Sequence, residues 1–141
     1  MDLTKTQELI FSGKICPYCK QKTEFVDSSI VYGGKSFGMI YLCRKCDAYC
    51  GVHKNTKKSL GRLANEKLRK LKKEAHEYFD MIWQSRLMSR KNAYKLMSDK
   101  LNLPIEYTHI GMFSEKTCEN VIYHSKQILK DNKLKIKQKQ F

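Results

Sequence analysis

The sequence contains no apolar run that approaches the roughly 18–20 residues needed to span a bilayer. Its first residues, MDLTKTQELIFSGK, also lack the basic start and the long apolar stretch of a secretory signal. We therefore expect a cytoplasmic protein that has no membrane partner. In the reducing cytoplasm, cysteines at CxxC spacing are typical of metal sites rather than of disulfides.

Acidic residues are scarce, since 14 Asp and Glu stand against 28 Lys and Arg and leave a net charge of +14. The excess is uneven. Residues 1–50 carry a net charge of only +2, residues 51–80 carry +5 and residues 81–141 carry +7. Such an excess favours an anionic partner, nucleic acid before an acidic protein surface. The basic character therefore belongs to the chain that follows residue 50.

The signature motifs of several enzyme classes are missing. The sequence contains no HExxH, no Walker A loop and no GxSxG, and it lacks the combined motifs of a zinc deaminase. Histidine is the usual acid–base residue near neutral pH, but His53, His76, His109 and His124 show no diagnostic spacing. We therefore predict no catalytic residue. A metal-independent ribonuclease that uses a histidine pair and a lysine is the enzymatic alternative.

Two CxxC pairs carry the strongest local signal in the sequence. Two residues between the cysteines of a pair let a tight turn aim both thiolates at one ion, and two such turns complete a tetrahedron around zinc. Four cysteine ligands close the coordination sphere, whereas a catalytic zinc keeps one position open. The sequence therefore predicts one structural zinc ion, held by Cys16, Cys19, Cys43 and Cys46.

The segment between the two pairs has the composition of a β-hairpin. Residues 23–32, TEFVDSSIVY, are rich in β-branched and aromatic side chains, Gly33 and Gly34 supply a turn, and residues 36–42 run back to the second pair. A turn, a hairpin and a second turn make up a zinc ribbon. We predict this ribbon, with a short N-terminal extension, over residues 1–54.

Cys50 and His53 follow the second pair closely and leave alternatives open. Either residue could replace Cys43 or Cys46 as a ligand, and the spacing from Cys46 to Cys50 suits a metal site. The simpler interpretation is a third strand, AYCGVH, in which Cys50 is a small buried residue. Cys118 lies within a helical pattern and is predicted to belong to a core.

A helical region is predicted over residues 55–130. Apolar residues keep helical spacing from Leu60 to Ile82, which indicates a long amphipathic helix that begins near residues 60–65 and continues past residue 80. The ribbon and this region together predict an α+β fold.

Two more helices are expected. Ser89 can cap a helix over residues 90–101, and Ser114 can cap another. Residues 131–141 are basic and have few apolar side chains. We expect them to form either a frayed helix end or a flexible basic tail.

A basic loop leads from the ribbon into the long helix, whose outer face is also basic. Such a surface could follow a phosphate backbone, although a solvated helix face has the same composition. The predicted phosphate contacts are Lys54, Lys57, Lys58, Arg62, Arg69, Lys70 and Lys73.

Aromatic residues of the ribbon suggest a second mode of contact. Tyr18, Tyr32, Phe37 and Tyr41 could stack on unpaired bases, which favours RNA or single strands, or they could be ordinary core residues.

Several segments of the chain are similar to one known family. CPYC, VDSS, YLCRKCDAYCGVHKNT, LGRLA, LRKLKKEAHEYFD and HIGMF together resemble a zinc-finger-containing domain family of bacteria and their phages, long catalogued without a function. The resemblance implies a four-cysteine zinc module with a helical part attached, in a phage or mobile-element setting. Members often have valine where this chain has Cys50, which supports Cys50 as a non-ligand, and proline where it has Ser59.

We therefore predict a nucleic-acid-binding accessory protein in which zinc shapes the ribbon. The alternative from another class is a phage-type inhibitor or adaptor that binds a host nucleic-acid-processing complex, such as a defence system. A basic protein can bind an acidic surface of such a complex or its RNA, so composition does not separate the two hypotheses.

Overall fold

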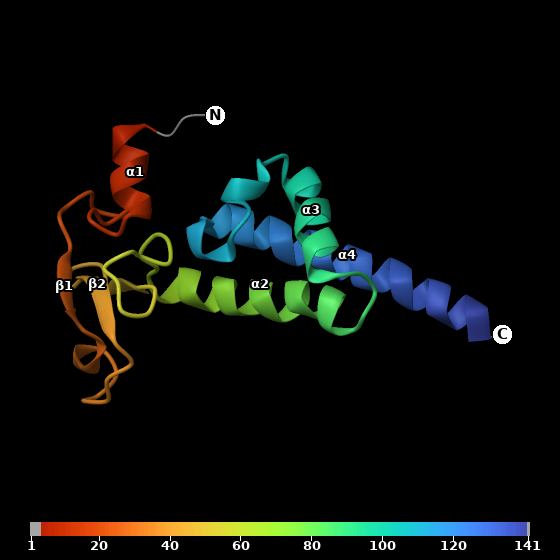
Figure 1. The fold of residues 1–141 in the computed structure, drawn as a ribbon, viewed down its shortest axis with the longest axis horizontal. Coiled ribbons are helices and arrows are strands. Elements are labelled where there is room, and N and C mark those ends of the chain that lie inside the picture. The colour runs from red at the N-terminus through yellow and green to blue at the C-terminus, as the bar shows by residue number, and fades with distance from the viewer. Residues whose placement is uncertain (1–3, 141) are drawn as a thin grey trace. The chain divides into compact units, whose positions relative to one another are not determined.

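The structure is a computed structural model that describes residues 4–140, with side chains as far as residue 132. The chain divides into two compact units, residues 1–69 and residues 70–141, and the division falls within the long helix α2 (Figure 1). The first unit contains a small sheet and the second is helical, so the predicted α+β fold is confirmed.

A three-stranded antiparallel sheet forms the centre of the first unit. Its strands are β1 (Glu24–Asp27), β2 (Met39–Cys43) and β3 (Ala48–Gly51), in the order β1-β2-β3. Phe25 pairs with Tyr41 in the first ladder, and their rings lie 5.0 Å apart between centroids. Strand β2 is the central strand and is mostly buried, because it has a neighbour on both edges.

The first predicted strand is shorter than expected. It ends at Asp27, whose carboxylate accepts a hydrogen bond from the Ser29 backbone N–H at 2.8 Å and caps the 3₁₀ helix η1 (Ser28–Ile30). A short acidic side chain that bonds the backbone two residues on favours a turn over a strand. The β-branched residues that follow Asp27 therefore do not extend the ladder.

The core of the first unit consists of side chains from the sheet and from the loops around it. Helix α1 (Lys5–Phe11) precedes the sheet and is capped by Thr4, which forms a capping box with Gln7. The buried residues of the cluster are Cys16, Tyr41, Cys43, Ala48 and Leu63. Two of these are predicted zinc ligands, so the metal centre and the apolar core of the unit are one structure.

Helix α2 (Glu66–Gln84) begins at the late end of the predicted range and continues past residue 80, as predicted. Leu60 lies outside the helix and is 50% exposed. Asn65 sets the start, because its side-chain oxygen accepts a hydrogen bond from the Leu68 N–H at 3.0 Å. In the second unit, α2 buries a stripe formed by Ala75, Phe79 and Ile82.

Two further helices complete the second unit. Ser89 caps α3 (Arg90–Leu101), as predicted, by accepting a hydrogen bond from the Asn92 N–H at 3.1 Å. The short 3₁₀ helices η2 (Ile105–Tyr107) and η3 (Ile110–Met112) follow.

Helix α4 (Glu115–Gln140) is the last element. Cys118 is fully buried in it, in agreement with its predicted place in a core. The helix includes most of the predicted basic tail, but the side chains beyond residue 132 lie outside the described ones. The tail and the domain boundaries proposed at residues 54 and 130 therefore stay predictions.

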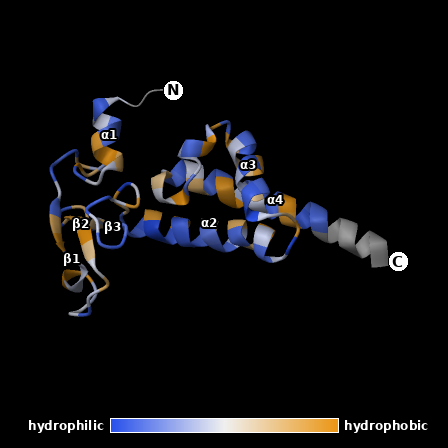
Figure 2. Cartoon of the chain, viewed as in Figure 1, coloured by the Kyte–Doolittle hydropathy of each residue, from blue (hydrophilic) through white to orange (hydrophobic). Residues whose placement is uncertain are grey.

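Figure 2 shows how hydropathy is distributed along the helices, and the visible side of α2 is mainly hydrophilic. Within the described part of the chain, no helix combines the length and the apolarity that crossing a bilayer would require.

Candidate metal centre and basic surface

The two CxxC pairs form turns of similar local geometry. In each, the residue after the second cysteine has a left-handed backbone, with φ of 62° at Lys20 and 49° at Asp47. The Lys20 N–H also donates to the Cys16 carbonyl at 2.9 Å, and this bond closes the first turn. Both turns therefore bend the chain sharply enough to point two sulfurs in one direction.

The structure brings the four predicted cysteines together. The Sγ atoms of Cys16, Cys19, Cys43 and Cys46 all lie within 4.8 Å of one another, and those of Cys19 and Cys43 are 3.7 Å apart. Four thiolates at about 2.3 Å from a tetrahedral zinc lie about 3.8 Å from one another. The donor set and its spacing fit one zinc ion in a closed, structural site, as predicted.

The four thiols differ in acidity. A hydrogen bond from the Gln21 backbone N–H lowers the pKa of Cys19 to about 7. Partial burial among the other thiols raises the pKa of Cys46 to about 12 and also raises the pKa of Cys43. Zinc binds thiolates, so the ion must displace protons from the less acidic cysteines.

We expect zinc binding at pH 7 to release at least about two protons per ion, because thiols of ordinary or raised pKa, such as Cys43 and Cys46, carry protons when no metal is bound. Protons compete with zinc, so the apparent affinity falls as the pH is lowered and rises as it is raised. Calorimetric titrations in buffers of different ionisation enthalpy measure the number released. Release close to zero would contradict a four-thiolate site, and Cys50→Ser should not change the count.

Cys50 takes no part in the four-cysteine cluster. It lies in β3 and is half-buried against the core, and its Sγ is 3.3 Å from the Gly51 carbonyl and 3.5 Å from the Gly61 carbonyl. This agrees with the interpretation of Cys50 as a packed residue of a third strand. His53 follows that strand and is exposed.

The remaining histidines lie in the second unit. His76 Nδ1 is 3.7 Å from an Asp80 carboxylate oxygen one helical turn further on. His109 lies beside the ring of Tyr94, and His124 beside the ring of Tyr123. The structure places His53 in the first unit, apart in sequence from these three. The prediction of no catalytic residue and the ribonuclease alternative both stay untested.

Most of the predicted phosphate contacts of the first unit are accessible. Lys54, Lys57 and Lys58 are exposed in the loop that follows β3. The guanidinium of Arg62 lies 5.2 Å from the centroid of the Phe11 ring, and this residue is only half-exposed. The two contacts predicted in the second unit, Lys70 and Lys73, are exposed on α2.

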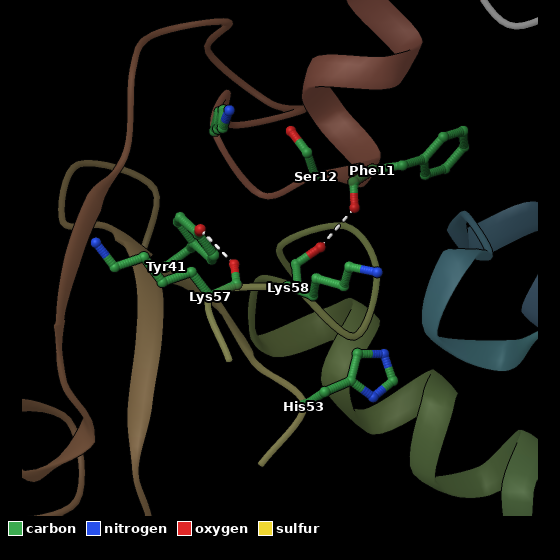
Figure 3. A pocket seen from close by; sticks show the side chains of 8 residues that line it. Phe11, Ser12, Tyr41, His53, Lys57 and Lys58 are labelled. Atoms are coloured by element: carbon green, nitrogen blue, oxygen red, sulfur yellow. Dashed lines mark hydrogen bonds between the residues drawn. The ribbon is translucent and has the colours of Figure 1, made fainter. Parts of the chain in front are cut away.

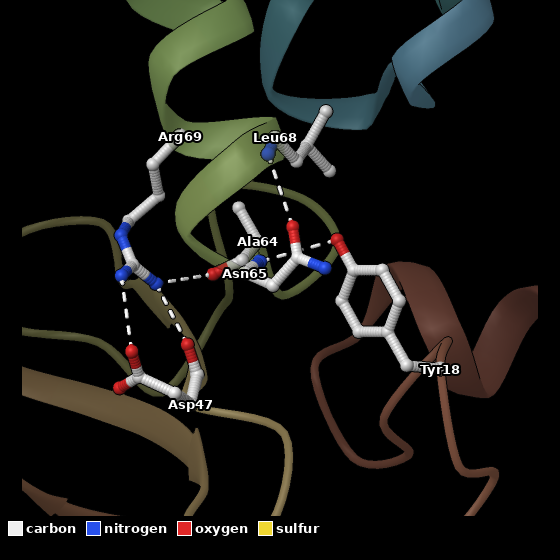
Figure 4. Close-up of polar contacts among 6 residues, drawn as sticks. All are labelled: Tyr18, Asp47, Ala64, Asn65, Leu68 and Arg69. Carbon is white, nitrogen blue, oxygen red and sulfur yellow. Dashed lines mark hydrogen bonds and ion pairs between the residues drawn. The ribbon is translucent and has the colours of Figure 1, made fainter.

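Arg69 is held by contacts within the first unit (Figure 4). Its guanidinium donates to the backbone carbonyls of Asp47 and Ala64 at 2.8 and 2.7 Å, and it lies 3.5 Å from the Asp47 carboxylate. It also stacks over the ring of Tyr49 at 4.2 Å. Asp47 follows the zinc ligand Cys46 directly, so Arg69 ties the start of α2 to the second CxxC turn.

Replacing Arg69 with alanine should lower the free energy of opening the sheet by about 1–3 kcal/mol, because two carbonyls and a carboxylate lose a charged donor. Native-state hydrogen exchange of the β2 and β3 amides measures this quantity. Arg44→Ala is the matched control. It removes a 2.6 Å ion pair with Glu24 whose side chains are half-exposed, and such pairs are worth about 0–1 kcal/mol. Equal effects of the two variants would contradict the anchoring role.

Two of the four aromatic residues proposed to stack on bases are occupied by internal contacts. Tyr41 is buried, and its hydroxyl donates to the Lys57 carbonyl at 2.6 Å. The Tyr18 hydroxyl accepts a hydrogen bond from the Asn65 N–H at 3.1 Å, next to the start of α2 (Figure 4). These two rings support the fold of the first unit.

The other two aromatic residues form an exposed pair. Phe37 is 66% exposed and Tyr32 is 44% exposed, and their rings meet edge to face with centroids 5.1 Å apart. The ammonium group of Lys35 lies 5.3 Å from the centroid of Phe37. An exposed aromatic pair beside a cation has the composition of a base-stacking surface.

Comparison with known proteins adds one finding. A family model described as a zinc-finger-containing domain matches residues 12–128. The matched range includes both CxxC pairs, and the resemblance read from the sequence is therefore confirmed. The search of curated proteins and the search of solved structures returned no match.

Proposed function

Because the chain belongs to the zinc-finger-containing domain family, we propose that it is a nucleic-acid-binding accessory protein whose bound zinc shapes the binding surface. The zinc ion supplies structural stability, since its four thiolate ligands leave no open position for a substrate. The residues that contact the nucleic acid are therefore sought outside the metal centre.

The observation that carries the proposal is the ordered basic loop that follows β3. Lys54, Lys57 and Lys58 are exposed within seven residues of the sheet. The loop is closed by hydrogen bonds from the His53 N–H to the Lys58 carbonyl at 2.9 Å and from the Thr56 hydroxyl to the His53 carbonyl at 2.7 Å. Lysines on an ordered loop are placed to contact phosphates with little loss of backbone entropy.

The strength of the phosphate contacts differs among the residues we propose. The loop lysines are the principal contacts, and Arg62, Lys70 and Lys73 add positive charge. A phosphate contact by Arg69 would compete with its bonds to the Asp47 and Ala64 carbonyls, so this residue contributes mainly through the fold.

We favour RNA or single strands over duplexes. Tyr32 and Phe37 offer exposed rings in the segment between β1 and β2, and the faces of bases become available to such rings only when the bases are unstacked. A phage or mobile-element setting, the cytoplasm as location and a host protein complex as a further partner stay predictions of the sequence.

The experiment that tests the proposal is the salt dependence of binding. Fluorescence anisotropy with short labelled RNA, single-stranded DNA and duplex DNA should show binding at low salt, with an affinity that falls linearly in log–log form as salt is raised. Absence of binding at low salt, or an affinity that salt does not change, would overturn it. Capture of one stoichiometric host protein complex, without bound nucleic acid, would favour the inhibitor alternative.

A further inference from the structure

A pocket opens in the first unit between the end of α1 and the basic loop (Figure 3). Its volume of about 520 Å³ falls within the range of about 300–1,000 Å³ that is common for small-molecule sites. The lining combines aromatic, hydroxyl and basic side chains. The residues are Phe11, Ser12, Lys14, Tyr41, His53, Lys57, Lys58 and Ser59.

The walls of the pocket are fixed by hydrogen bonds between segments that are distant in sequence. The Ser59 hydroxyl donates to the Phe11 carbonyl, and the Tyr41 hydroxyl donates to the Lys57 carbonyl at 2.6 Å (Figure 3). These bonds tie the basic loop to α1 on one side and to the central strand on the other. The pocket is thus formed before any ligand arrives, which reduces the entropic cost of binding.

Gly13 allows the chain to approach the pocket closely. Its φ is +82°, and a Cβ at this position would lie 2.7 Å from Cδ2 of Tyr41 and 3.1 Å from Cβ of Ser59. Any side chain here would therefore displace two residues of the lining. The turn after α1 needs a glycine to bring Lys14 to the rim.

The charge of the lining selects an anion. Of the described residues that line the pocket, three are lysines, one is a histidine and none is a carboxylate. Lys14 and Lys58 are exposed at the rim, while the Lys57 ammonium lies over the Phe25 ring at 5.8 Å. The Phe11 ring and the lysine methylenes make part of the remaining surface apolar.

A ligand that matches this lining carries a negative charge next to a flat, partly apolar group. A free phosphate would use the lysines and leave the apolar walls unfilled, and an apolar molecule would leave the lysines without a partner. A nucleotide has both parts, since its phosphate suits the ammonium groups and its base suits the apolar surface.

We propose that this pocket binds a single nucleotide, with its phosphate at the lysines of the rim and its base along the apolar part of the lining. The inference rests on the proposed function, because the pocket is the part of the proposed binding surface that holds one nucleotide of a strand. A nucleotide within an unpaired strand and a free mononucleotide share this chemistry, and the experiment separates them.

The test is a titration of the ¹⁵N-labelled, zinc-loaded protein, followed by amide chemical shifts. The probes are the four nucleoside monophosphates, a nucleoside without phosphate, inorganic phosphate, and a short single-stranded oligonucleotide. We expect the monophosphates and the oligonucleotide to shift the amides of residues 11–14 and 53–59. The nucleoside and inorganic phosphate should bind at least about fivefold more weakly than a monophosphate, since each lacks one part of the ligand.

A matched pair of variants tests the assigned residues. Lys58→Gln removes a lining lysine and should weaken mononucleotide binding by at least about fivefold. Lys5→Gln removes an exposed lysine of α1 that does not line the pocket and should change this binding by less than about twofold. Equal effects of the two variants would overturn the assignment of the phosphate.

The remaining outcomes separate the pocket from the proposed function. If an oligonucleotide binds with a steep salt dependence but leaves the lining amides unmoved, the pocket inference is wrong and the proposed function stands. If mononucleotides bind but no strand does, the proposed function is wrong and the pocket is a site for free nucleotides. If inorganic phosphate binds as well as a monophosphate does, the site takes anions in general and the nucleotide inference fails.

Discussion

Replacing Cys43 with serine should abolish tight zinc binding and unfold the first unit. Cys43 ends β2, is 7% exposed, and belongs both to the four-cysteine cluster and to the buried core. Structural zinc sites contribute apparent free energies of about 10–16 kcal/mol, whereas a folded domain is stable by only about 5–15 kcal/mol. A ribbon with a core of this size therefore depends on its metal.

Metal analysis together with amide spectra checks this prediction. The wild-type chain should contain about one zinc ion, and Cys43→Ser should contain much less and lose the dispersed amide signals of the sheet. Cys50→Ser is the matched control, because it changes the same residue type in the neighbouring strand β3, outside the cluster. It should retain the zinc. Zinc loss in both variants would indicate that Cys50 is a ligand, and zinc retention in Cys43→Ser would contradict the site.

Removing the three loop lysines should weaken single-strand binding by about tenfold to a hundredfold at low salt. The variant changes Lys54, Lys57 and Lys58 to glutamine. Each lysine that neutralises a phosphate adds about 0.7 to the slope of log affinity against log salt for single strands, so the slope should decrease by about 2. Anisotropy titrations over a series of salt concentrations measure both quantities.

A second triple variant separates local contacts from total charge. Lys91, Lys95 and Lys100 are exposed on α3, and changing them to glutamine removes the same three charges from the +14 of the chain. This variant removes no proposed phosphate contact and affects only the nonspecific attraction that depends on net charge. It should therefore change the salt slope by less than about 1. Equal losses in the two triple variants would assign the binding to overall charge and not to the loop.

The features that depend only on residues close together in the sequence could be predicted from the sequence alone. Two residues between cysteines are enough to specify a turn with two converging sulfurs, so the four ligands and the metal were predictable. Ser89 caps α3 through its own N-terminal turn, and the bounds of that helix were predicted correctly for the same reason. The positive charge that follows residue 50 is likewise a property of composition.

Some local signals were missed where polar side chains competed with apolar patterns. Asp27 ends β1 by capping a 3₁₀ helix, although the following residues favour a strand. Asn65 starts α2, so Leu60 lies outside a helix whose periodicity it fits. In both places a single side-chain hydrogen bond to the backbone decides a boundary that hydrophobic spacing does not specify.

The assignment of individual side chains was decided only by the tertiary structure. Arg69 fits the basic pattern of its helix as well as Lys70 does, yet the folded chain places two carbonyls and the Tyr49 ring around its guanidinium. Tyr41 and Phe37 are both aromatic residues of the ribbon, but one is 8% exposed and the other 66%. Sequence alone cannot separate such residues, because burial depends on partners that are distant along the chain.

The pocket likewise depends on the tertiary structure and could not be predicted from the sequence. Its lining comes from three segments, residues 11–14, Tyr41 and residues 53–59, and hydroxyl-to-carbonyl bonds join them. The sequence by itself determined the zinc ligands and the basic character of the chain after residue 50, since spacing and composition are local properties. The tertiary structure decided which lysines surround a common cavity, since that depends on long-range packing around the metal centre.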